Sequence, residues 1–195
     1  MFYLVEIEDI VAIPPRDFGK PLRKVVLERL REAYEGKIVE DLGHVVMVVD
    51  VEADPVGILL PRDGSTYHKA RAKLLCFYPR VQEVGEGEVV EITDFGAFIR
   101  VGPLDALLHI SQIMDDYITY DERHSILTGK KTGKKLEVGD IVRFRVVAVS
   151  LTHGTAGKVG VTTRQPYLGK LEWIRESLEK LAPKPEKAKA VAGES

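Results

Sequence analysis

The sequence predicts an α+β first half followed by an all-β barrel and a C-terminal helix. Two patterns lead to this fold class: long apolar strand patterns around one amphipathic helix in the first half, and five short strand patterns with glycine-containing turns in the second. The 195 residues are enough to build two cores of ordinary size. We therefore predict domains at residues 1–80 and 81–181, and a disordered tail rich in Lys, Ala and Glu at 182–195.

The first half predicts a small, mostly antiparallel sheet that carries one helix. Alternating apolar residues over Phe2 to Ile13 predict a half-buried strand, which two prolines end. Apolar residues at helical spacing run from Leu22 to Ala33, and Gly36 stands where a left-handed cap would close the helix. Four further strands are predicted at Lys37–Val39, His44–Val51, Val56–Leu60 and Tyr67–Phe77.

This sheet has more apolar surface than one helix can cover. Residues 45–49 and 56–60 are apolar at consecutive positions, so both faces of the sheet are expected to need cover. A partner chain could supply the cover, or the long segment 67–77 could wrap over the second face, and the pattern leaves both open. Cys76, between Leu75 and Phe77, is expected to be a core residue.

Beyond Pro79 the pattern changes to short strands at regular spacing, which is typical of a small closed barrel. Apolar residues at helical spacing from Leu171 to Leu181 then predict a final helix, with Trp173 as its anchor and Pro183 as its stop. The five barrel strands are predicted at Glu88–Ile92, Phe95–Val101, Leu104–His109, Ile141–Val149 and Lys158–Thr163.

One wall of this barrel is a candidate surface for RNA. The period of two in a strand points Phe98 and Arg100 outward, a bulge at Gly96 would turn Phe95 to the same face, and His109 points outward on the next strand. Phe95, Phe98 and His109 would form a platform of flat rings for unpaired bases, where stacking contributes about 1–3 kcal/mol per base. Four cations share an outward parity and are predicted to meet phosphates: Arg143, Arg145, Lys158 and Arg164.

Composition and motifs exclude several other classes of protein. With 28 Lys and Arg against 30 Asp and Glu, the formal net charge is −2, so any contact with nucleic acid must rest on a local patch. A single cysteine excludes an intramolecular disulfide, and five scattered histidines offer no zinc motif. The start of the chain lacks the basic flank of a signal peptide, and no apolar run approaches the roughly 20 residues of a membrane helix. We expect a cytoplasmic protein that starts at Met1, without cofactor, metal or membrane contact.

The segment Gln112 to Glu137 is longer than an ordinary hairpin connection. Its piece from Gly129 to Lys135 lacks the spacing and the Gly-Lys-Ser/Thr end of a phosphate loop, so we reject a nucleotide site. Its four lysines are either a solvated tip or a guide for a nucleic-acid backbone. Nothing fixes the geometry of Asp115, Asp116 and their neighbours for a metal or for acid/base catalysis, and we predict no catalytic residue.

Several sequence blocks carry resemblances to known families. The run at 87–99, the block at 107–111 and Val138-Gly139-Asp140 resemble the S1 RNA-binding domain, a version of the OB fold. The S1 family often has Asp at the position of Ser150 and Arg near Lys158, so this chain departs from it at two polar contacts. Taken whole, the chain is similar to the E-prime subunits of archaeal RNA polymerase, the counterpart of the seventh subunit of eukaryotic RNA polymerase II. The wider resemblance rests on residues 1–15, 43–49, 116–121 and 163–173.

This resemblance implies a function. The first half would be a truncated ribonucleoprotein-like domain that docks on the polymerase core, and the second half an S1 barrel. The chain would form a heterodimer with a small helical polymerase subunit, and this stalk would meet emerging single-stranded RNA. It would be non-catalytic, because the carboxylates that hold the Mg²⁺ ions of the polymerase lie in another chain. An S1-containing component of an RNA-processing or exosome complex is the alternative. An S1-type translation initiation factor is a third hypothesis, which expects the barrel at the N-terminus.

Overall fold

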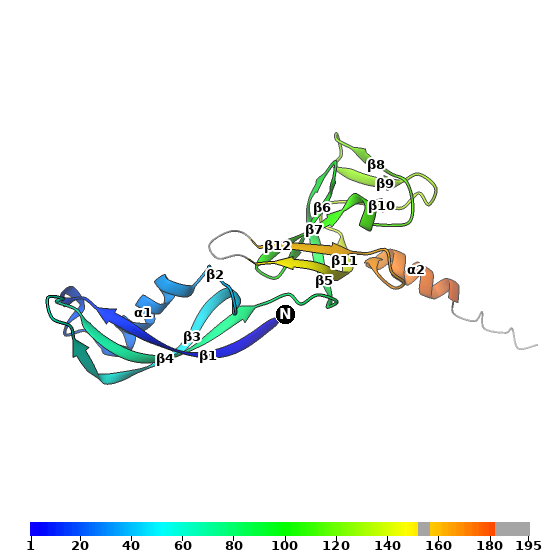
Figure 1. The fold of residues 1–195 in the computed structure, drawn as a ribbon. Helices are drawn as coiled ribbons and strands as arrows, with labels where there is room; N and C mark the ends of the chain where they lie inside the picture. Colours follow the sequence, from blue (N-terminus) through cyan, green and yellow to red (C-terminus); the bar gives the residue numbers. More distant parts are fainter. Residues whose placement is uncertain (152–156, 182–195) are drawn as a thin grey trace, which may run out of the picture.

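The computed structural model describes residues 1–151 and 157–181. It contains two domains that lie end to end along one long axis (Figure 1). The first is a four-stranded sheet with one helix, and the second is a five-stranded closed barrel followed by a helix, so the predicted fold class is confirmed. The tail predicted at 182–195 lies outside the described residues. No helix in the described part of the chain is long and apolar enough to cross a membrane.

The first sheet is antiparallel, in the order β1-β4-β3-β2. After β1 and a short 3₁₀ turn, α1 packs against β3 and β1 and buries Val25, Val26 and Leu30. Gly36 follows the helix with φ of +73°, which is the left-handed turn that its sequence position predicted. The elements of this domain are β1 Phe2–Ile13, the turn η1 Pro15–Asp17, α1 Leu22–Tyr34, β2 Ile38–Val39, β3 Gly43–Leu59 and β4 Thr66–Phe77.

The two strands predicted at His44–Val51 and Val56–Leu60 are one strand, β3. Its pairing with β4 shifts register at three places, one of which contains Pro55, and a bulge is where a strand tolerates proline. The shifts also explain the consecutive apolar residues, because Val45 and Val48 are buried under α1 while Met47 is exposed on the opposite face.

The face of the sheet opposite α1 is open in the described part of the chain. β4 runs between β1 and β3, so segment 67–77 does not wrap over this face, and this one of the two open alternatives is wrong. The middle of the face is charged rather than apolar: Glu8 bonds Lys69 and Arg71 at 2.9 and 2.8 Å, and Glu6 lies opposite Lys73. The lysine and then the arginine lower the pKa of Glu8 by hydrogen bonding its carboxylate.

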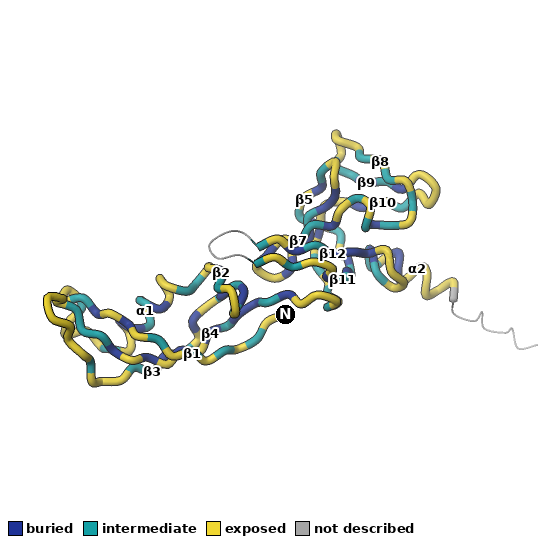
Figure 2. Tube along the Cα trace, in the orientation of Figure 1, coloured by how far each residue is buried: buried dark blue, intermediate teal, exposed yellow. Residues whose placement is uncertain are grey.

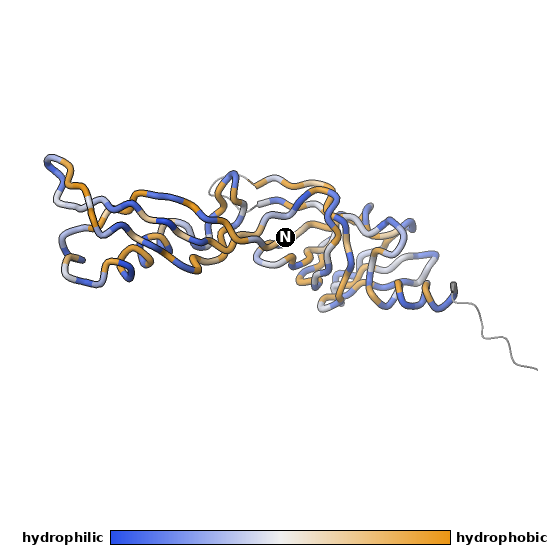
Figure 3. Tube along the Cα trace, turned by 90° about the horizontal axis from the view of Figure 1, so that it is seen from below, coloured by the Kyte–Doolittle hydropathy of each residue, from blue (hydrophilic) through white to orange (hydrophobic). Residues whose placement is uncertain are grey.

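Exposed apolar residues gather at the two ends of the first domain instead. The tip patch lies at the end away from the barrel, around the exposed β3–β4 connection (Figure 2, Figure 3), and comprises Ile10, Val56, Ile58, Leu59 and Leu60. The junction patch lies toward the barrel and comprises Leu4, Met47 and Val49. The need for cover is therefore local to these two patches.

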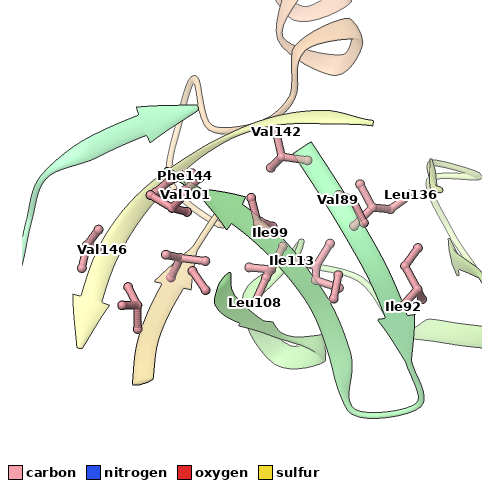
Figure 4. Packing of buried hydrophobic residues seen from close by; sticks show 14 of the residues in the cluster. Val89, Ile92, Ile99, Val101, Leu108, Ile113, Leu136, Val142, Phe144 and Val146 are labelled. Atoms are coloured by element: carbon pink, nitrogen blue, oxygen red, sulfur yellow. The ribbon is translucent and has the colours of Figure 1, made fainter. Parts of the chain in front are cut away.

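The barrel strands follow the order β12-β7-β6-β5-β11, and pairing of β11 with β12 closes the ring. Figure 4 shows the core, in which side chains from all five strands meet side chains from the long connection between β7 and β11. Trp173 of α2 packs against this core, as predicted. The elements are β5 Val84–Thr93, β6 Gly96–Val101, β7 Leu104–His109, η2 Ile110–Gln112, β11 Ile141–Ser150, β12 Lys158–Thr162, β13 Gly169–Lys170 and α2 Leu171–Leu181.

The long connection between β7 and β11 forms a separate three-stranded antiparallel sheet, which the sequence did not predict. It packs on the end of the barrel and contributes Ile113, Leu127 and Leu136 to the barrel core (Figure 4). Its strands are β8 Ile118–Asp121, β9 Ile126–Gly129 and β10 Lys135–Leu136.

The two domains share a packed junction. Phe77, the last residue of β4, belongs to the barrel core, and its ring centroid lies 4.9 Å from that of Phe2. Gly102, in the β6–β7 turn, lies beneath both rings: a Cβ built there would be 3.0 Å from Phe2 and 3.1 Å from Phe77. The absence of a side chain at Gly102 thus lets the barrel approach the sheet.

Candidate nucleic-acid interface

The candidate surface lies on β6 and β7, where strand parity sets the side-chain directions as predicted. Ala97 and Ile99 are buried on β6, whereas Phe98 is half-buried and Arg100 exposed on its outer side. Across the ladder, Gly96 pairs with His109, which is exposed. Phe98 and His109 therefore lie on one outer wall of the barrel.

Phe95 reaches this wall by a different route from the one predicted. It is the second residue of a two-residue turn, Asp94–Phe95, between β5 and β6, and no bulge occurs at Gly96. Phe95 is 45% exposed, and its ring stands edge-on to that of Phe98, with centroids 6.0 Å apart and an interplanar angle of 89°. Such an edge-to-face pair is a favourable aromatic geometry, so the two rings fix each other.

The His109 ring is held by the turn that follows it. Nδ1 accepts a hydrogen bond from the backbone N–H of Ser111 at 3.2 Å and lies 2.8 Å from the Ser111 hydroxyl. His109 thus caps η2 with its own side chain. The cap fixes the orientation of an exposed ring, which is what a stacking surface requires.

Two residues of this wall were missed by the sequence reasoning. Leu107 pairs with Phe98 on one side and with Gly160 of β12 on the other. A row across three strands therefore consists of Phe98, Leu107 and Gly160. Because glycine has no side chain, nothing projects from the barrel at its end of the row. The parallel pairing of β7 with β12 joins segments about 50 residues apart, so no local pattern indicated it.

Three of the predicted cations surround this row. Arg100 is bonded to Asp105 at 2.9 Å, and this carboxylate raises the pKa of the arginine, so a phosphate would compete with an existing partner. Lys158 is exposed at the start of β12, one residue before the pairing of β12 with β7 begins. Arg164 donates to the Ser111 carbonyl at 3.4 Å, which places its guanidinium beside the His109 turn.

The other two predicted cations lie elsewhere. β11 pairs with the first half of β5, so β5 separates it from β6. Arg143 is bonded to Glu86 at 2.8 Å, and Arg145 lies 3.4 Å from the Gln82 side chain. Arg143 and Arg145 therefore point outward, as predicted, but contact side chains near β5 rather than the platform, because outward residues on different walls of a curved barrel point in different directions. Their contact with phosphates stays a prediction.

Two acidic side chains near the platform, Asp105 and Asp115, are bonded to arginines. Glu91, which pairs with Phe98 across the ladder, and Asp94, which precedes Phe95, are exposed. Among residues 1–151 and 157–181, no group of three or more His, Cys, Asp or Glu side chains is arranged to hold a metal ion. Asp115 accepts a hydrogen bond from Arg164 at 2.7 Å. This carboxylate therefore neutralises a cation at the edge of the wall.

Comparison with known proteins accounts for both domains. Residues 8–64 match the "SHS2 domain found in N terminus of Rpb7p/Rpc25p/MJ0397", and residues 78–156 match the S1 RNA binding domain. The chain is 45% identical over 178 residues to DNA-directed RNA polymerase subunit Rpo7 of Saccharolobus solfataricus. The aligned residues cover 91% of this chain and 99% of that protein. The chain belongs to the Rpo7 family.

Two further relatives show the breadth of the Rpo7 family. Subunit Rpo7 of Sulfolobus acidocaldarius is 38% identical over 180 residues, covering 92% of this chain and 98% of its own. DNA-directed RNA polymerase II subunit RPB7 of Saccharomyces cerevisiae is 21% identical over 171 residues, which cover 87% of this chain and 99% of that protein. The predicted resemblance to the archaeal subunit and to its eukaryotic counterpart is confirmed.

Membership in the Rpo7 family makes the chain a non-catalytic subunit of DNA-directed RNA polymerase, as predicted. The similarity extends through the first domain as well as the S1 barrel. An S1-containing RNA-processing component or initiation factor would be expected to share the barrel alone. These two alternatives therefore lose their support.

Proposed function

We propose that this Rpo7-family subunit holds emerging single-stranded RNA on the wall formed by Phe95, Phe98 and His109. The observation that carries the proposal is the platform itself: three exposed or half-exposed rings on neighbouring segments of an S1 barrel, with Lys158 and Arg164 on the same side. Flat rings beside cations suit stacked bases joined by phosphates.

The same arrangement supports weak sequence selection. Every base has a face that stacks on a phenyl or imidazole ring, whereas a base edge is read only by placed donors and acceptors. Arg100 and Arg164 already have carboxylate partners at 2.9 and 2.7 Å, so they are not free to read base edges. The subunit would accept many RNA sequences and release them readily.

We assign the two apolar patches of the first domain to protein partners. The tip patch lies at the end away from the barrel, so docking it on the polymerase core would leave the RNA wall open. The junction patch lies beside the barrel, where the small helical polymerase subunit could contact both domains of this chain. Leu4 at 66% exposure and Val56 at 75% are far more open than strand residues that need no partner.

The RNA wall is tested by the double substitution Phe98→Ala and His109→Ala. Loss of stacking should weaken binding of a single-stranded oligonucleotide about 5- to 150-fold for each stacked base that is lost, since each stacked base contributes about 1–3 kcal/mol. The measurement is RNA crosslinking and fluorescence anisotropy with the co-expressed heterodimer. Phe18→Ala, an exposed phenylalanine of the first domain, is the matched control and should bind RNA as the unaltered chain does. Unchanged crosslinking in a double variant that still co-purifies with its partner would refute the wall.

A further inference from the structure

The inserted sheet presents a second exposed ring beside cations. Tyr117, directly before β8, is 67% exposed. The Lys130 ammonium, directly after β9, lies 4.4 Å from the centroid of this ring, within cation–π range, and Lys131 follows it. This aromatic residue and the lysines are outside the platform, and folding leaves most of the ring open to solvent.

The loop that carries the lysines is held in place by Asp116. Its carboxylate accepts hydrogen bonds from the backbone N–H of Lys131 at 2.9 Å, from that of Thr132 at 2.8 Å, and from the Thr132 hydroxyl at 2.9 Å. A Cβ at Gly129 would lie 2.7 Å from this carboxylate, so the glycine makes room for the anchor. These hydrogen bonds to Asp116 therefore hold the lysine loop in a defined conformation.

A continuous set of contacts joins this surface to the platform. His109 lies against Ser111, Arg164 donates to the Ser111 carbonyl at 3.4 Å, and the same guanidinium bonds Asp115 at 2.7 Å. Asp115 and Asp116 lead directly to Tyr117. The exposed cation Arg164 therefore lies between the two sets of rings.

We propose that Tyr117, with Lys130 and Lys131, is a second stacking site for single-stranded RNA, so that the strand runs from Phe98 and His109 past Arg164 onto the inserted sheet. The proposal rests on the proposed function and extends it with a further site and a path. Two linked sites bind one strand more tightly than either alone, because the second contact is intramolecular.

The path is tested with the heterodimer and two uridine homopolymers, one of about 4 nucleotides and one of about 12, within the range of site sizes for this fold. Tyr117→Ala should weaken binding of the longer strand about 5-fold or more and leave the shorter strand unchanged. Tyr117→Phe keeps the ring and is the matched control, which should bind as the unaltered chain does. Equal effects of Tyr117→Ala on both lengths, or none on either, would overturn the path.

A second measurement tests the lysines independently of the ring. Each phosphate contact on a single strand contributes about 0.7 to the slope of log affinity against log salt. Replacing Lys130 and Lys131 by Ala should lower this slope by about 1.4 for the longer strand, and an unchanged slope contradicts their role. If the Phe98 and His109 double variant weakens both strands while the insertion variants change neither, the second site fails and the proposed function stands. If the double variant changes neither strand, both proposals fail.

Discussion

At the scale of single residues, Gly160 keeps the proposed RNA wall flat. It lies beside Leu107 on the outer side of the barrel, and it is a glycine where strands usually favour β-branched residues. The atoms nearest to a Cβ there would be Ala148 Cβ at 3.5 Å and Val147 Cγ2 at 3.8 Å, which are ordinary contacts. The fold can therefore accept a side chain at this position, whereas RNA on the proposed wall would lose space there.

This predicts that Gly160→Ala and Gly160→Val weaken RNA binding in increasing order while the barrel stays folded. Valine should cost several-fold in affinity because its methyl groups would cover Leu107 and block a base. Its strand propensity should hold or raise the melting temperature. Anisotropy and thermal melting on the same samples check both parts. A valine variant that melts earlier and binds RNA normally would contradict the assigned row.

The same residues show what the sequence could predict of the site. The orientations of Phe98 and His109 follow from a period of two, which depends only on local backbone geometry. The row through Leu107 and Gly160 depends on which strands meet in space. For Arg143, parity predicted the outward direction but could not give the direction around a closed barrel, so its position away from β6 was not predictable.

At the scale of elements, the periodicity of apolar residues was sufficient to predict the strands and helices that are regular. The predicted bounds of β1 match the structure, and α1 extends one residue beyond its predicted span. β3 differs because bulges absorb Pro55, a residue that normally argues against a strand. Strands β8 to β10 were not predicted, because they are short and the loop beside them is held by contacts of Asp116 with residues 15 and 16 positions away.

Asp116 gives the inserted sheet a pH dependence that can be measured. Hydrogen bonds, first from the Thr132 backbone N–H, hold the pKa of this carboxyl below its usual value. A depressed folded pKa means that the anchor contributes fully above the unfolded value of about 3.9 and is lost as pH falls through the folded value. The protection of the Lys131 and Thr132 amides, relative to their intrinsic exchange rates at each pH, should therefore fall only in that acidic window.

The matched variant is Asp116→Asn, which keeps the size of the side chain but removes the charge. It should bring fast exchange at Lys131 and Thr132 to neutral pH and abolish the acidic transition there. Protection of β6 amides is the internal control, because the barrel ladder does not use this carboxylate. Continued protection at Lys131 in the variant would show that the loop is held by other contacts.

At the scale of the whole molecule, the proposed RNA wall and the two patches assigned to protein partners belong to different domains, so the junction decides whether they act as one body. The junction includes the rings of Phe2 and Phe77, which lie against Gly102, and an ion pair between the Met1 amino group and Glu83. Phe77 belongs to the barrel core although it ends a strand of the first sheet. A subunit docked by its tip patch could hold RNA at a fixed place only if this contact is rigid.

Gly102→Val is expected to separate the domains. Gly102 has φ of +63°, where a side chain is strained, and its Cβ would be 3.0 Å from the Phe2 ring. Gly19→Val is the control for backbone strain alone, because Gly19 has φ of +81° and nothing within 4 Å of an added Cβ. Strain of this kind costs about 1 kcal/mol or more in both variants, whereas only the junction variant must also move two aromatic rings. Small-angle scattering should therefore show a changed distance distribution for Gly102→Val and an unaltered one for Gly19→Val. Identical profiles for the two variants would mean that the ring contact does not set the arrangement of the domains.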